Sequence, residues 1–213
     1  MTIIDSGPAR AGLMARAQGI ITKPAAEWDV IDGESATVSG LFTGYVCILA
    51  AIPLVAGILG ALLMSVFFHG AIIIALVVAI VAYALELVGV FVVGFIVDAL
   101  APSFDGQRSL VQGMKIAAYS FTAVWVAGIL SFIPFLGALV VIAAIIYGLY
   151  TMYLGLPKLM KNPPEKTMGY FLVVLVISIV IRAVMFWVAA AIGAMMMFSA
   201  AASTAAALGA FPH

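Results

Sequence analysis

Three ionisable residues interrupt long apolar stretches of the sequence: Glu86, Asp98 and Arg182. A charge inside an apolar stretch is costly to bury, so it usually pairs with an opposite charge or marks a functional position. Glu86 and Arg182 each lie about halfway along their stretch, which predicts a buried ion pair between two side chains at matching depth. Asp98 follows Glu86 by about three helical turns, so both carboxylates share roughly one helix face.

These three residues allow two interpretations. In the first, Glu86 and Asp98 line an ion or proton route near Arg182. In the second, Glu86 and Arg182 form an ion pair that locks two helices, and Asp98 is hydrated at the membrane surface. We favour the lock, because one acid and one base are enough for it, whereas a relay normally needs more members.

Pro53 stands near the centre of the first apolar stretch and removes a backbone hydrogen bond there. It is therefore a candidate hinge beside a gate or cavity. A static bend is the simpler interpretation, because proline is more frequent in membrane helices than in soluble ones.

Other types of chemistry have little support in the sequence. It contains no phosphate loop, dinucleotide fingerprint or nucleophile–base pair, so we expect no enzymatic activity. The single cysteine, Cys47, and the isolated His69 and His213 do not make a metal site. We therefore expect neither a metal nor a cofactor.

The composition defines the elements that must position these residues. Of 213 residues, 66% are hydrophobic and 8% are charged, with a mean hydropathy of +1.30. A soluble domain is about 45–50% apolar and about 25% charged, so a soluble globule is excluded. A net charge of zero argues against a nucleic-acid-binding protein. The chain is predicted to be an all-α integral membrane protein.

Long apolar stretches predict a bundle of five transmembrane helices, since about 20 apolar residues cross the hydrocarbon layer. Residues 1–36 form an amphiphilic segment that precedes the helices, and residues 199–213 form a short tail. The five helices are expected at about residues 38–68, 71–101, 110–131, 134–156 and 168–198.

Basic residues predict the orientation of the bundle. Eight of the nine lysines and arginines lie in the N-terminal segment, the second loop region and the fourth loop: Arg10, Arg16, Lys23, Arg108, Lys115, Lys158, Lys161 and Lys166. Positively charged loops stay in the cytoplasm. The N-terminus is therefore expected in the cytoplasm and the C-terminus outside, in a multi-pass protein of the inner (plasma) membrane.

The N-terminal segment combines basic residues with Trp28. Such a segment commonly lies along the membrane surface, with the aromatic side chain as an interfacial anchor. The alternative is a solvated and partly frayed terminus.

Several short segments resemble the Yip1 domain family, especially its bacterial inner-membrane branch. Their order and spacing over roughly residues 19–195 carry the resemblance. The segments are residues 19–24 (GIITKP), 27–31 (EWDVI), 51–54 (AIPL), 98–102 (DALAP), 133–137 (IPFLG) and 153–157 (YLGLP).

The resemblance implies five spans with a cytoplasmic N-terminus. Eukaryotic members are associated with Rab GTPases, but this chain has too little cytosolic surface for that partner to be carried over. We expect a non-enzymatic protein of membrane organisation, whose partners are the lipid bilayer and either a second copy of the chain or another membrane protein. The alternative is a small transporter or ion channel that uses Glu86, Asp98 and Arg182.

Overall fold

The computed structural model describes residues 12–65, 72–133 and 135–209, and it contains no strand among them. The expected turn at residues 69–70 lies outside these ranges. Within these ranges five helices are long and apolar enough to cross a membrane, which confirms the predicted all-α bundle. They run over Val38–Leu63, Ile72–Phe104, Leu110–Leu130, Leu136–Met160 and Pro164–Ser203.

The first two spans form an antiparallel pair. The Thr37 side chain accepts a hydrogen bond from the amide of Gly40 at 3.1 Å and caps the start of the first span. Pro53 lies inside the first span, as the sequence indicates. The elements of this pair are α3 (Val38–Leu41), the π-helical η1 (Phe42–Val46), α4 (Cys47–Ser65), α5 (Ile72–Leu100) and the short η2 (Ala101–Phe104).

The remaining spans are α6 (Leu110–Ser120), α7 (Thr122–Ala127) and η3 (Gly128–Leu130), followed by α8 (Leu136–Met160) and α9 (Pro164–Gly209). α8 continues past the expected end at about 156, and α9 begins before about 168 and continues past about 198. Pro157 is tolerated inside the last turns of α8, and Pro164 starts α9 at a position where a missing amide hydrogen costs nothing. The alanine-rich sequence after residue 198 favours helix, so α9 replaces most of the expected tail.

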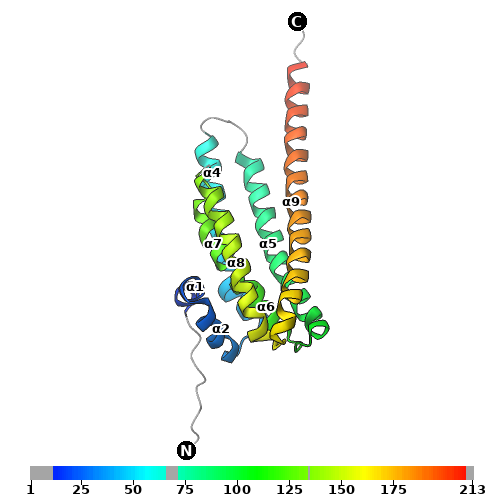
Figure 1. The fold of residues 1–213 in the computed structure, drawn as a ribbon. Helices are drawn as coiled ribbons and strands as arrows, with labels where there is room; N and C mark the ends of the chain where they lie inside the picture. The colour runs from blue at the N-terminus through cyan, green and yellow to red at the C-terminus, as the bar shows by residue number, and fades with distance from the viewer. Residues whose placement is uncertain (1–11, 66–71, 134, 210–213) are drawn as a thin grey trace, which may run out of the picture.

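The N-terminal segment forms two helices, α1 (Leu13–Thr22) and α2 (Pro24–Gly33). They make a hairpin beside the bundle, at the end where α8 passes into α9 (Figure 1). Ile20 and Trp28 are fully buried. In the part of the segment that the structure describes, the hairpin is thus a packed component of the fold rather than a free terminus.

The two halves of the bundle are packed differently. We call residues 12–50, 86–125 and 144–182 the docked half, because they include the hairpin and the parts of the spans beside it; the described remainder of the spans is the open half. Every buried residue of α5 follows Glu86 and lies in the docked half: Gly89, Val90, Val93, Gly94, Val97 and Asp98. The buried residues of α9, as far as its burial is described, are Thr167, Tyr170 and Val174, also in the docked half.

The open half exposes many of its large apolar side chains, among them Leu59, Leu63, Ile73 and Phe198. Lipid chains are as apolar as these side chains. This half is therefore suited to contact with lipid on most of its surface.

Candidate functional site

Glu86 of α5 and Arg182 of α9 lie in direct contact, at the boundary between the two halves. Both terminal nitrogens of the guanidinium donate to the carboxylate: Nη2 to Oε1 at 3.0 Å, and Nη1 to Oε2. This two-pronged geometry is the strong form of a carboxylate–guanidinium contact. The Glu86 side chain is 18% exposed and the Arg182 side chain is 36% exposed, so the pair is only partly covered by protein.

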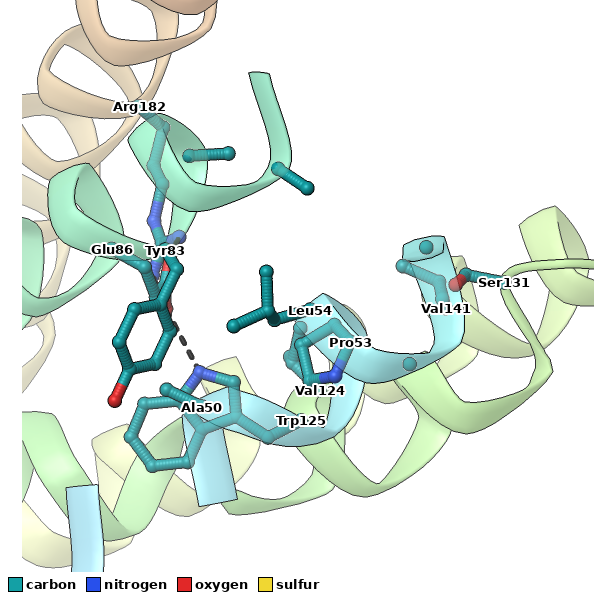
Figure 2. A pocket seen from close by; sticks show the side chains of 14 residues that line it. Ala50, Pro53, Leu54, Tyr83, Glu86, Val124, Trp125, Ser131, Val141 and Arg182 are labelled. Atoms are coloured by element: carbon teal, nitrogen blue, oxygen red, sulfur yellow. Dashed lines mark hydrogen bonds and ion pairs between the residues drawn. The ribbon is translucent and has the colours of Figure 1, made fainter. Parts of the chain in front are cut away.

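Two aromatic residues of the third span complete this site, which we call the Glu86 cluster: Glu86, Phe121, Trp125 and Arg182. The indole nitrogen of Trp125 donates to Oε1 of Glu86 at 2.9 Å (Figure 2). The guanidinium carbon of Arg182 lies 4.4 Å from the centre of the Phe121 ring, a cation–π distance. The cluster therefore joins α5 and α9 to the third span.

Trp125 and Phe121 were missed in the sequence. Phe121 gives no signal there, because phenylalanine is common in apolar spans. Trp125 gives a weak one, because a buried indole N–H needs an acceptor and few side chains in these spans could supply it.

A cavity of about 390 Å³ adjoins the cluster and extends into the open half. Figure 2 shows Glu86, Tyr83 and Trp125 at one end, and Pro53 and Ser131 farther along its wall. Most of the remaining lining is apolar, including Ala50, Leu54, Ala79, Val124 and Val141. Pro53 thus borders the cavity that reaches the intramembrane acid, and its role as a hinge stays a prediction.

Asp98 does not join the cluster. It lies in the docked half, where Nη2 of Arg108 donates to its Oδ2 at 3.3 Å. Between Asp98 and Glu86, the buried side chains of α5 include Val90, Val93 and Val97, which belong to the apolar core. The structure therefore brings Glu86 and Arg182 together and separates both from Asp98.

Trp28 packs inside the protein rather than facing lipid, a position that does not support its expected role as an interfacial anchor. Its side chain is fully buried, and its indole nitrogen donates to the Thr151 carbonyl of α8 at 2.9 Å. A Cβ on Gly155 would lie 2.8 Å from the indole ring, so a glycine is what lets the ring approach α8. The Tyr119 ring meets the indole edge-on at 6.2 Å.

Two buried cations hold the hairpin to the bundle. Arg16 donates to the carboxylates of Glu27 and Glu34 and lies over the ring of Tyr119. Nζ of Lys115, on α6, donates to the carbonyl oxygens of Ile31 at 2.8 Å and Glu34 at 2.6 Å. Buried charges need partners of this kind, so these contacts satisfy groups that would otherwise oppose docking.

Three exposed ion pairs occur at the same end of the molecule: Lys158 with Asp29, Lys161 with Asp32 and Lys166 with Asp105. Exposed pairs contribute about 0–1 kcal/mol each. The first two orient the docked hairpin without adding much stability, and the third joins the start of α9 to the loop after η2. Among the described residues, no group of three histidine, cysteine or acidic side chains could hold a metal ion.

Five apolar helices with a packed N-terminal hairpin define a multi-pass α-helical membrane protein. The chain belongs to the Yip1 domain family, whose model matches residues 19–186. It is 28% identical over 180 residues to the inner membrane protein YohC of Escherichia coli K12, a match that covers 81% of this chain and 92% of that protein. YohC of Escherichia coli O6:H1 matches to the same extent.

No solved structure matches the chain. The family and the two relatives confirm the resemblance read from the sequence, and they place this protein in the inner membrane as a multi-pass protein. They assign no chemistry to the Glu86 cluster.

Proposed function

We propose that this protein is a non-enzymatic organiser of the inner membrane, which acts through its contacts with lipids and with neighbouring membrane proteins. The observation that carries the proposal is the unequal build of the two halves. The docked half contains parts of all five spans and the hairpin α1–α2, whereas the open half contains spans alone.

The hairpin lies alongside the spans rather than below them. The Tyr147 hydroxyl donates to the carbonyl oxygens of Ile20 at 3.0 Å and Ile21 at 2.9 Å. Tyr147 precedes the last residue of α8, Met160, by thirteen residues, or about 20 Å of helix. Since a bilayer with its headgroups is about 40–45 Å thick, α1 would sit among the lipids of one leaflet.

The exposed surface of the hairpin suits that position. Met14, Ile21 and Val30 present apolar side chains outward, next to the polar Gln18 and Lys23. A helix of mixed character lies at the boundary between headgroups and chains. The hairpin therefore adds cross-section in one leaflet only, and such a shape favours a curved membrane.

We assign the docked half to the cytoplasmic leaflet. Lys158, Lys161 and Lys166 lie at that end, and positive charges mark the cytoplasmic side. A cysteine placed at Gly33 should then react with a membrane-impermeant maleimide only after the cells are opened. Reaction in intact cells would reverse the assignment.

A sorting experiment tests the shape proposal. The full chain, inserted in one orientation into vesicles of phosphatidylethanolamine and phosphatidylglycerol, should concentrate on a narrow tube pulled from the vesicle. A Trp28→Ala variant that remains folded but releases the hairpin should sort less. Equal densities of the wild-type protein on the tube and on the flat membrane would contradict the proposal.

A second candidate function is ion or proton transport through Glu86, Asp98 and Arg182. The cavity of about 390 Å³ that reaches Glu86 favours it. The apolar packing between Glu86 and Asp98 does not supply a route onward. Flux of protons or cations in proteoliposomes that Glu86→Gln abolishes would establish this function, and flux no greater than in empty vesicles would remove it.

A further inference from the structure

A second cleft, of about 550 Å³, opens between α8 and α9 with the third span as its floor. Ile145 and Met152 line its α8 wall, and Leu175, Ile179 and Trp187 line its α9 wall. Arg182 borders both this cleft and the cavity beside Glu86. The cleft therefore reaches the Glu86 cluster from the opposite side.

The dimensions of the cleft match a lipid chain. From Leu175 to Trp187 it follows α9 for twelve residues, about 18 Å, while one leaflet contributes about 15 Å of hydrocarbon, half of the ~30 Å core. Ile179 and Trp187 are exposed, the latter by 71%. Its rim on α9 is accordingly open to the surrounding lipid.

One polar group on the floor has no hydrogen-bond partner among the residues that the structure describes. The Ser120 side-chain oxygen is buried, with the residue 1% exposed, and makes no hydrogen bond. A buried hydroxyl without a hydrogen-bond partner is energetically unfavourable. The other serine in the cleft, Ser178, already donates to the carbonyl of Val174 at 2.7 Å. Ser120 therefore points to a ligand with a hydrogen-bond acceptor.

We propose that the α8–α9 cleft binds a phospholipid, with one acyl chain lying along α9 and an ester carbonyl accepting a hydrogen bond from Ser120. The acyl chain covers apolar walls that no described side chain covers. The ester is the acceptor that a phospholipid carries at the head of its chain. This inference rests on the lipid contacts of the proposed function and names their ligand.

A matched pair of α9 variants tests the site. Ala183 lines the cleft, whereas Ala190 is exposed on the same helix, two turns farther on, and does not line it. Native mass spectrometry with added dioleoyl phosphatidylglycerol should show one tightly bound lipid per wild-type chain. Ala183→Phe fills the cleft and should weaken that binding by about tenfold or more, because several methylene groups lose their burial. Ala190→Phe should bind as the wild type does.

The hydroxyl contact has its own test, which does not depend on filling the cleft. Wild-type protein should bind the ester-linked lipid several-fold more tightly than its ether-linked analogue. Ser120→Ala should abolish that difference while keeping the melting temperature. Equal binding of the two lipids to wild-type protein would overturn the role of Ser120.

Equal lipid binding by Ala183→Phe and Ala190→Phe, or the absence of any saturable lipid, would overturn the site itself. These outcomes leave the sorting experiment unaffected, because that experiment depends on the hairpin. Conversely, wild-type protein that binds the lipid but does not sort to curved membrane would keep the cleft and refute the shape proposal.

Discussion

The docked and open halves of the same bundle are held together in different ways. The docked half has a core like that of a soluble protein, in which buried cations, carboxylates and an indole all have partners. The open half contains most of the cavity beside Glu86 and has many exposed apolar side chains. Contacts within the protein therefore stabilise one end of each span, while surrounding lipid covers the apolar side chains at the other end.

The largest expected loss of stability is that of a buried tryptophan in the docked half, compared with an exposed tryptophan in the open half. Trp28→Ala empties a fully buried site and removes the bond to Thr151, so it should lower the free energy of unfolding by about 3–5 kcal/mol. Trp187→Ala, at a position 71% exposed, should change it by less than about 0.5 kcal/mol. Thermal unfolding in detergent measures both. Similar losses of unfolding free energy would contradict the difference in packing between the two halves.

The ion pair at the boundary should come next. Arg182→Met leaves the Glu86 carboxylate without its cation, which should cost about 3 kcal/mol, the low end for a pair that is only partly covered. Adding Glu86→Gln should restore most of the loss, because the unpaired charge is gone. Lys158→Met, which breaks an exposed pair, should cost under about 1 kcal/mol. A double variant no more stable than Arg182→Met would refute the lock.

Two glycines offer the finest comparison. A Cβ on Gly155 would meet the Trp28 ring at 2.8 Å, whereas a Cβ on Gly57 would meet no atom within 4 Å. Gly155→Ala should therefore destabilise the protein by about 1–3 kcal/mol through overpacking. Gly57→Ala should leave stability unchanged or raise it by up to about 1 kcal/mol, because alanine favours helix. Equal melting temperatures of the two variants would show that the docked half accommodates an added methyl group as readily as the open half.

The sequence predicts the number of spans well, because five apolar stretches leave few other arrangements. It also predicts the proximity of Glu86 and Arg182, since opposite charges at equal depth in a low-dielectric layer have few other partners. The end of α8 is difficult to predict because proline usually stops a helix, whereas Pro157 lies inside the last turns of α8. The start of α9 is difficult to predict because the polar residues 158–166 resemble a loop, whereas the helix already begins at Pro164.

The docked hairpin could not be predicted from local pattern. Arg16 and Trp28 look like residues of a surface helix, and their burial depends on partners far along the chain, such as Thr151 and Gly155. Lys115 gives one indication of the docked hairpin. It is a cation at the start of an apolar span, so its hydrogen-bond partners must come from another part of the chain. The carbonyl groups that bind it belong to the hairpin, and backbone acceptors leave no signature in a sequence.

The unequal lengths of two neighbouring helices have a consequence for bilayer thickness. α5 has 29 residues and α9 has 46, about 43 and 69 Å at 1.5 Å per residue. Both lengths exceed the ~30 Å hydrocarbon core, so α5 can meet a thicker membrane by tilting less. The longer helix has apolar turns to spare and stays inserted whatever the local thickness. Thickness changes are therefore felt on the flank formed by α4 and α5, while α9 holds the protein in place.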